Sequence, residues 1–149
     1  MSTSGHIWER AVSRLRAATV YWIATTRPDG RPHSMPVWGV WVDGALWFGT
    51  MGQKVRNLAH RPYAVAHLDS GEDVAIVEGP VERLPFAETP EAVFAAFHEK
   101  YVNPETGEPF ELLGDVPPSE NAAMYALRPS VGACLARGRV RRDADPLDG

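Results

Sequence analysis

The sequence predicts a mainly β fold of the α+β class, a small antiparallel barrel that carries a few short helices. Six or seven segments alternate apolar and polar residues or are rich in β-branched and aromatic residues. Turn signals join most of these segments, and neither βαβ alternation nor an internal repeat occurs. The 149 residues allow one domain with its own core, so we expect a single domain over 1–149, with flexible ends at about 1–5 and 140–149.

The composition is that of a soluble globular protein, with 44% hydrophobic and 23% charged residues. A net charge of −4 excludes a general nucleic-acid or membrane-surface binder, because such proteins carry a basic field. No apolar run approaches the roughly 20 residues that span a bilayer, and the N-terminus lacks the apolar stretch of a signal peptide. The single cysteine, Cys134, excludes an internal disulfide. We therefore expect a cytoplasmic protein that binds neither nucleic acid nor membrane.

A helix and a strand open the chain. Apolar residues recur at helical spacing over 7–18, which predicts an amphipathic helix. The stretch 20–26 is β-branched and aromatic, which is typical of a strand. Pro, Asp and Gly at 28–30 then predict a turn, so the strand should form a hairpin with the segment that follows.

The second strand of that hairpin, over 31–42, is long and irregular. Pro32 and Pro36 lack an amide donor, so the strand should contain a bulge or lie at an edge of the sheet. Asp43-Gly44 is the strongest hairpin signal in the sequence and joins this strand to the next one, over 45–50.

A short helix over 51–61, ended by Pro62, interrupts the predicted sheet. The strand pattern resumes over 63–69, turns at 70–73, and continues into a long, bent strand over 73–84 that contains a glycine. The sheet should therefore be built from both halves of the chain.

The rest of the chain predicts a second helix over 89–101, with Thr89 as its N-cap and Pro90 at its first position. The segment 102–118 is rich in Pro, Gly and Glu and is long enough to act as a lid. A final strand pair, 122–129 and 130–136, precedes a charged tail.

Motifs that would name a reaction by themselves are absent. The five histidines are scattered without an HExxH or paired Cys-His spacing, so no metal site is expected. The sequence also lacks GxSxG and the glycine-rich phosphate motifs GxGxxG and GxxxxGKS. No catalytic residue can be assigned from the sequence.

One segment, FGTMGQKVRN over 48–57, has the character of an anion site. It ends a strand, turns through two glycines, and opens a helix that carries Lys54 and Arg56 in its first turns. Free backbone N–H groups and the helix dipole favour an anion there, with Thr50, Lys54 and Arg56 completing the cage. In the alternative interpretation, both cations are simply solvated residues of a surface helix.

The neighbouring strand strengthens the first interpretation. The proline-interrupted backbone of RPHSMPVWGVWV lies beside the anion site across the Asp43-Gly44 hairpin, where it can present N–H and C=O groups to a flat ring. In the alternative interpretation, Met35, Val37, Trp38 and Trp41 are core or interface residues.

The run from Tyr21 to about Glu82 resembles the pyridoxamine phosphate oxidase-like split β-barrel family, and in particular its actinobacterial branch, which binds FMN or the deazaflavin coenzyme F-420. The resemblance rests on the hairpin ATTRPDGRPHSMPVW, the strand end FGT, and the helix start QKVRNL followed by RP. It implies a six-stranded antiparallel split β-barrel with short flanking helices, in which one domain binds a flavin or deazaflavin. It also implies a homodimer with both cofactors at the subunit interface.

The same resemblance assigns cofactor-binding residues. It implies that Thr50, Lys54 and Arg56 hold the cofactor phosphate, with Gln53 and Asn57 as further contacts. The strand that lies along the ring would comprise Ser34, Met35, Pro36, Val37 and Trp38. The C-terminal half lacks the substrate motif of pyridoxamine phosphate oxidases proper, so that vitamin reaction is not expected.

A dense group of tryptophans supports the dimer. Trp22, Trp38, Trp41 and Trp47 fall within 26 residues, and a barrel of this size cannot bury all four on its inner face. We expect some of them to pack across a subunit interface.

Three functional hypotheses follow. The first is an F-420-dependent oxidoreductase that transfers a hydride to a small organic acceptor, since the cofactor supplies the chemistry and no acid-base motif is needed. The second is an FMN-dependent oxidoreductase. It differs because the deazaflavin has a polyglutamate tail, for which Arg31, Arg56 and Arg61 would line a groove. The third is a non-catalytic dimer that stores or senses a flavin, with Met35 or Trp38 blocking the ring pocket. Nothing in the sequence names the acceptor.

Overall fold

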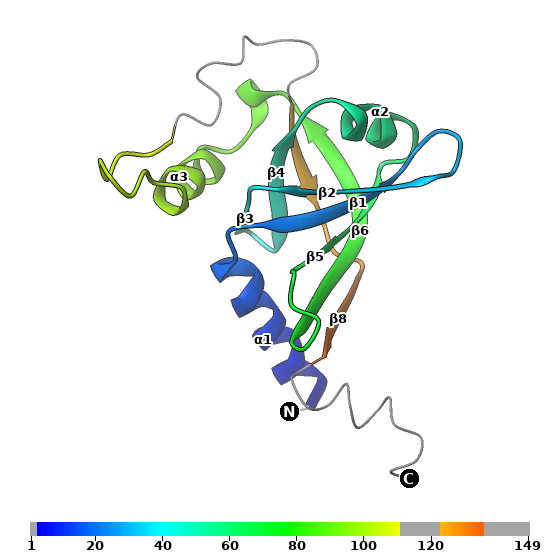
Figure 1. Ribbon diagram of the computed structural model, residues 1–149, viewed down its shortest axis with the longest axis horizontal. Coiled ribbons are helices and arrows are strands. Elements are labelled where there is room, and N and C mark those ends of the chain that lie inside the picture. Colours follow the sequence, from blue (N-terminus) through cyan, green and yellow to red (C-terminus); the bar gives the residue numbers. More distant parts are fainter. Residues whose placement is uncertain (1–2, 111–122, 136–149) are drawn as a thin grey trace.

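The computed structural model describes residues 3–110 and 123–135, which form one curled antiparallel sheet with helices around it (Figure 1). In chain order, the elements of this part are α1 (Thr3–Ala17), β1 (Tyr21–Thr26), β2 (Pro32–Val37), β3 (Gly39–Val42), β4 (Ala45–Thr50), α2 (Gln53–His60), β5 (Tyr63–His67), β6 (Val74–Leu84), the 3-10 helix η1 (Phe86–Glu88), α3 (Glu91–Lys100), β7 (Ala123–Leu127) and β8 (Val131–Leu135).

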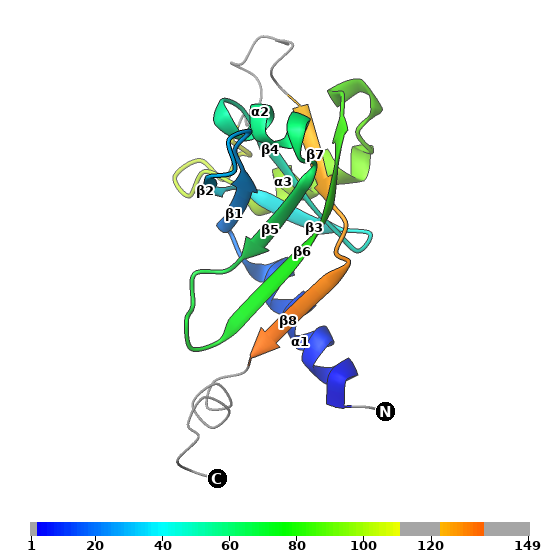
Figure 2. The ribbon, with the colours of Figure 1, turned by 90° about the vertical axis from the view of Figure 1, so that its right-hand side faces the viewer.

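The sheet closes into a barrel because the strand formed by β2 and β3 bends in its middle and pairs with a different strand on each side of the bend. The strand order is β2-β1-β5-β6-β7-β4-β3, and a single residue, Trp38, separates β2 from β3. β2 pairs with β1 while β3 pairs with β4, so the two ends of the order are joined through the chain itself. Counting β2 with β3 and β7 with β8 gives six strands, and the predicted antiparallel split barrel is confirmed (Figure 2).

The bend is held by close packing at Gly39. A Cβ atom at this position would lie 3.0 Å from the main-chain oxygen of Trp47 and 3.2 Å from the Tyr21 ring. The next hairpin follows the prediction, since Asp43 and Gly44 have φ angles of 52° and 71°, the left-handed pair that a tight two-residue turn needs.

The C-terminal strands correct one prediction. β7 and β8 were predicted to pair with each other, but both pair with β6, at Val81–Leu84 and at Val74–Glu78. β7 and β8 together form one long strand with a break at 128–130. The connection stays attached to β6, because the amides of Arg128 and Ser130 donate to the main-chain oxygens of Pro80 and Glu78. This crossing lies directly over Gly79.

The start of α3 corrects a second prediction. Thr89 does not cap the helix; its hydroxyl donates to the Pro85 carbonyl and so closes η1, an element that the sequence did not predict. Pro90 itself is the N-cap and no side chain bonds to that helix end. The apolar side of the predicted helix, formed by Val93, Phe94, Phe97 and Tyr101, faces the core: Phe94 is partly buried and the other three are buried.

The core occupies the barrel interior and extends under α3. Aliphatic and aromatic residues of β1, β4, β5, β6 and β7 form the main cluster, and a second cluster joins α3 to β3, β4 and β7. Two of the four clustered tryptophans, Trp41 and Trp47, are buried in these clusters. Trp22 is half-buried and stacks on His67, whereas Trp38 is exposed.

A network of hydrogen bonds joins the end of α3 to the bend between β2 and β3. Lys100 Nζ donates to the carbonyls of Ala18 (2.7 Å) and Gly39 (3.1 Å) and to the Tyr21 hydroxyl (2.8 Å). The hydroxyl of Tyr101 accepts from the Gly39 amide at 2.8 Å. The end of α3 therefore fixes the point at which β2 turns into β3.

Because this network contains Lys100 and Tyr101, we expect the stability of the protein to depend on pH in an unusual way. Burial lowers the pKa of Lys100 from 10.5 to about 8, and it raises the pKa of Tyr101 to about 12. Between pH 8 and 10 the unfolded chain binds the lysine proton that the folded protein has lost, so the free energy of unfolding should rise with pH. Above pH 10 it should fall, because the tyrosines ionise first in the unfolded chain. Urea unfolding at pH 7 to 11 measures both limbs, and Lys100→Met should remove most of the rise, whereas His98→Gln should keep it.

Some predictions fall on the part of the chain that is not described. Residues 111–118 of the predicted lid and the tail from 136 onward belong to it, as do residues 1–2; residues 3–5, predicted to be flexible, begin α1. In the described part, no helix has the length and apolar character needed to cross a membrane.

Candidate functional site

The candidate site lies where β2 separates from β4. The β3–β4 ladder ends at the pair Gly39 and Phe48, although β4 continues to Thr50 and pairs there with β7 on its other side. Beyond the bend, β2 follows β1 instead of β4. The barrel is split at this point, and main-chain groups of both strands face the gap.

The free edge of β2 has a donor pattern that its prolines determine. Arg27 donates to the Arg31 carbonyl at the start of the hairpin. Counting forward along β2 from Arg31 in steps of two makes His33, Met35 and Val37 the positions hydrogen-bonded to β1. Ser34 and both prolines of β2 therefore face away from β1. Since proline has no N–H, the Ser34 amide is the one main-chain donor on this edge between 32 and 36, and it stands among three carbonyl acceptors.

Across the gap, β4 passes into α2 through Met51 and Gly52. Gly52 has φ 77°, a left-handed conformation that favours glycine, and no side chain caps the helix. The first amides of α2 and the positive end of its dipole therefore remain available for an anion, next to Thr50 at the end of β4.

Lys54 is the most informative residue of this helix. It is only 6% exposed, and its ammonium group has no hydrogen bond or ion pair within residues 3–110 and 123–135. Burial lowers its pKa accordingly. A largely buried lysine without a counterion gains from a nearby negative group, which agrees with the anion site that the sequence predicts at this helix start.

The other predicted phosphate contacts support the helix itself. Asn57 is fully buried; its amide nitrogen donates to the Thr25 hydroxyl at 3.0 Å, and its oxygen accepts from Gln53 at 2.7 Å. Arg56 is exposed and donates to the Gln53 oxygen at 2.8 Å. These contacts fasten α2 to β1 and set the position of Lys54.

One residue of the site was missed by the sequence analysis. His33 pairs with Thr25 in the β1–β2 register, so both side chains lie on the same face, where Thr25 meets α2 through Asn57. The Nδ1 atom of His33 is shielded from solvent and has no hydrogen-bond partner in the described part of the chain. Burial, Lys54 and Arg27 all lower the pKa of this imidazole. The register fixed by the hairpin turn is the signal that would have found it.

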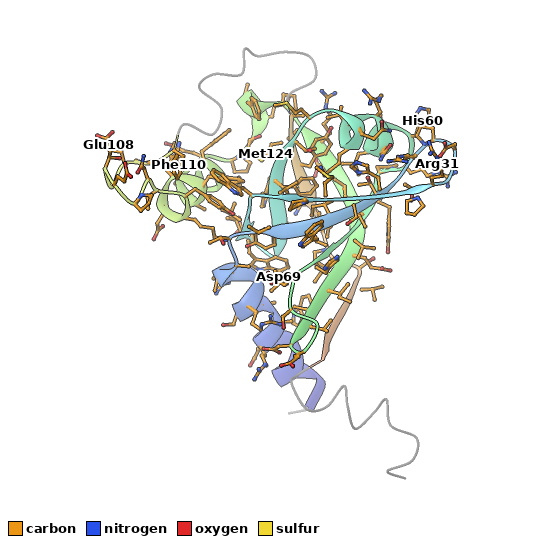
Figure 3. All side chains as sticks on the ribbon, in the orientation of Figure 1. Arg31, His60, Asp69, Glu108, Phe110 and Met124 are labelled. Atoms are coloured by element: carbon orange, nitrogen blue, oxygen red, sulfur yellow. The ribbon has the colours of Figure 1, made fainter. Side chains whose placement is uncertain are left out.

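The residues predicted to lie along a ring, on β2 and at Trp38 directly after it, are open in a single chain. Met35 is 49% exposed and Trp38 is 42% exposed, so neither is enclosed by the barrel. Trp38 stacks on Tyr101 with ring centroids 4.6 Å apart, and the ring of Phe110 lies 5.7 Å from that of Trp38. Figure 3 shows Phe110 on the segment that follows α3. The bend therefore presents apolar and aromatic surface next to the free edge.

The end of the barrel beside α2 is basic. Figure 3 shows Arg31 at the tip of the β1–β2 hairpin and His60 at the end of α2, on the same side of the molecule. Arg31 forms an exposed ion pair with Asp29 at 2.8 Å, and Arg56 and Arg61 are exposed on or next to the helix. Several exposed cationic side chains therefore lie on or near the helix that carries Lys54.

The arrangement fits a phosphate ester joined to a flat ring. Lys54, Thr50 and the start of α2 match the phosphate, and the free edge with its Ser34 amide matches the polar margin of a ring. Among the described residues, no group of three His, Cys, Asp or Glu side chains is placed to hold a metal ion. The site can therefore bind and orient a cofactor that brings its own reactivity.

Comparisons with known proteins agree with this architecture. The sequence profile of the family described as Pyridoxamine 5'-phosphate oxidase matches residues 7–129. No curated protein matches the chain significantly. A solved structure described as an F-420 reductase is 24% identical, covers 81% of this chain and 94% of its own, and has a TM-score of 0.62.

Two further solved structures are similar. A conserved hypothetical protein from Mycobacterium tuberculosis is 22% identical over 95% of this chain and 88% of its own, with a TM-score of 0.67. A heme storage protein from Vibrio cholerae is 14% identical over 93% and 97%, with a TM-score of 0.62. At these identities, structural likeness shows a shared fold alone.

Proposed function

The chain belongs to the pyridoxamine 5'-phosphate oxidase family, and from this premise we propose that it is an oxidoreductase that uses the deazaflavin coenzyme F-420 to transfer a hydride to a small organic acceptor. The alternative within the same site is an FMN-dependent oxidoreductase. A non-catalytic flavin-storage protein is the third outcome that the experiment below distinguishes.

One observation carries the proposal: the side chain of Lys54 lies at the start of α2, across the split from a free strand edge, and is 6% exposed with no hydrogen-bond or ion-pair partner among the described residues. A phosphate there gains charge-assisted hydrogen bonds in a partly desolvated setting. Met35 and Trp38 do not close the ring surface in a single chain, so the occluded pocket expected of the third hypothesis is not favoured.

The residues of this chain bind and orient. Lys54, Thr50 and the α2 amides hold the phosphate; Ser34 and the carbonyls of β2 fix the edge of the ring; Met35 and Trp38 cover apolar surface and exclude water. The bound cofactor supplies the hydride chemistry, which is why no acid-base pair is required.

The basic end of the barrel favours the deazaflavin over FMN. FMN ends at its phosphate, whereas F-420 continues into a polyglutamate tail that needs positive charge beyond it. Arg56 of α2 and Arg61 directly after it are exposed, and Arg31 at the hairpin tip lies on the same side of the molecule as the end of α2. The described F-420 reductase structure is consistent with this choice.

We propose further that the protein acts as a homodimer. Exposed apolar side chains, among them Met35, Trp38 and Met51, surround the split, where a partner would cover them together with the cofactor.

A side-by-side fluorescence titration with F-420 and FMN tests the proposal. We expect both cofactors to bind, F-420 more tightly than FMN. The substitution Arg61→Ser should weaken the binding of F-420 but not that of FMN. Tighter binding of FMN would favour the FMN-dependent oxidoreductase. Binding without turnover of any acceptor would favour the non-catalytic flavin-storage protein. The same preparation in light scattering should have the mass of two chains. Binding of neither ligand overturns the proposal.

Substitution of Ser34 by Pro should weaken cofactor binding without disturbing the barrel. The change removes the main-chain donor on the free edge of β2. Like Pro32 and Pro36, position 34 faces away from β1, so proline there removes no hydrogen bond from the β1–β2 ladder. We expect affinity to fall by about tenfold, the size of one hydrogen bond to a ligand. Ser34→Ala, which keeps the N–H, should bind like the wild type; equal losses in both variants would assign the effect to the hydroxyl.

A further inference from the structure

His33 lies at the site without a role in the binding scheme above. Its side chain is on the inner face of β2, opposite Thr25, which accepts a hydrogen bond from Asn57 of α2. This places the imidazole beside the helix that carries Lys54. Its Nδ1 atom is shielded from solvent and has no hydrogen-bond partner within the described residues.

The charges that act on His33 are both positive. They come from Lys54 of α2 and from Arg27 in the turn after β1, and together with burial they lower the pKa of the imidazole. The nearest acidic residue in that turn, Asp29, is engaged by Arg31. Burial and these two cations therefore favour the neutral imidazole while Lys54 lacks a counterion.

We propose that His33 couples binding of the cofactor phosphate to the uptake of a proton. The proposal rests on the proposed function and deepens it. Burial disfavours the charged imidazole most, and the positive charge of Lys54 disfavours it further. An anion beside Lys54 offsets this second effect, so the occupied site holds two cations, Lys54 and protonated His33, near one phosphate. His33 acts as an electrostatic positioning residue, not as a direct ligand.

The sign of the effect follows from linkage. Because the anion favours the charged imidazole, the charged imidazole must favour the anion by the same factor. Affinity for a phosphate-bearing ligand should therefore rise as the pH falls through the titration of His33, and the rise should stop once the histidine is protonated in both free and bound protein.

A proton NMR titration observes the coupling directly. The ring C–H resonance of His33 is identified by its absence from His33→Gln and followed from pH 4.5 to 8.5, with and without a saturating concentration of F-420 or FMN, whichever binds more tightly. We expect the ligand to raise the proton affinity of His33 about fivefold or more, the lower end of coupling between linked sites. The riboflavin-type core without the phosphate should not. Unchanged titration of His33 in the occupied protein overturns the inference; if His33→Gln fails to fold, the resonance is assigned with His33→Asn instead.

Dissociation constants from pH 5 to 8 give the reciprocal measurement. The ratio of wild-type to His33→Gln affinity should grow about fivefold toward low pH. The ligand's own ionisations cancel in this ratio. His60→Gln, at the exposed end of the same helix, is the matched control and should follow the wild type. A constant ratio overturns the proton coupling but leaves the proposed function standing, whereas binding of no phosphate-bearing ligand overturns both.

Discussion

Substitution of Lys54 by Met is expected to stabilise the free protein and to remove most of its affinity for a phosphate-bearing cofactor. The side chain is 6% exposed and its ammonium has no partner in the described residues, so the folded protein carries a desolvated charge whose pKa is lowered by burial. Met keeps the apolar stem and deletes the charge. The free energy of unfolding should rise by roughly 1 kcal/mol, within the range of single stabilising substitutions.

Binding should change in the opposite direction. Loss of a charge-assisted hydrogen bond costs about 1.5–3 kcal/mol, which corresponds to a fall in affinity of roughly 10- to 150-fold. Urea unfolding of the free protein and fluorescence titration with F-420 and FMN measure the two effects. Arg56→Met, an exposed position on the same helix, should leave stability within about 0.5 kcal/mol. Unaltered affinity in Lys54→Met would place the phosphate elsewhere.

The second large effect is structural and lies outside the site. Substitution of Gly79 by Ala should destabilise the barrel by about 3 kcal/mol or more and prevent folding in a marginal background. The added Cβ would lie 2.1 Å from the Arg128 carbonyl oxygen and 2.9 Å from the Ser130 amide nitrogen, both main-chain atoms. Relief requires the loss of the hydrogen bonds that hold the β7–β8 connection to β6.

Gly71→Ala provides the matched control. A Cβ at Gly71 meets nothing within 4 Å, so thermal unfolding should be close to that of the wild type. Equal melting temperatures for the two variants would show that the β7–β8 connection can move away from β6 at little cost.

Local signals were sufficient for most of the fold. Alternation located the strands, the Asp43-Gly44 pair fixed the β3–β4 hairpin, and the prolines of the second strand indicated its irregular edge. Long-range pairing was less accessible: β7 and β8 look like a hairpin in sequence, because their shared partner β6 lies some 40 residues earlier and only its Gly79 marks the crossing. The N-cap prediction for Thr89 was wrong because a hydroxyl before a helix can bond a preceding carbonyl, here that of Pro85, instead of the first amides of the helix.

The candidate site was predictable in composition but not in energetics. The sequence placed Lys54 at a helix start, where most lysines are solvated, and only the fold reveals that this one is buried without a counterion. His33 could not be connected to it, because the link passes through the register with Thr25 and then through Asn57. The cofactor-binding role of these residues stays a prediction until binding is measured.

The bend at Trp38 also restricts how the length of this chain can vary. Because one residue joins β2 to β3, the β1–β2 and β3–β4 ladders share a single register. An inserted or deleted residue there would shift one ladder against the other, and a shift of one position turns every side chain of a strand to the opposite face. Side chains around the split can be exchanged one by one, but the spacing from Pro32 to Val42 must be kept. Relatives that diverge in ligand should therefore differ in residue types along this strand and not in its length.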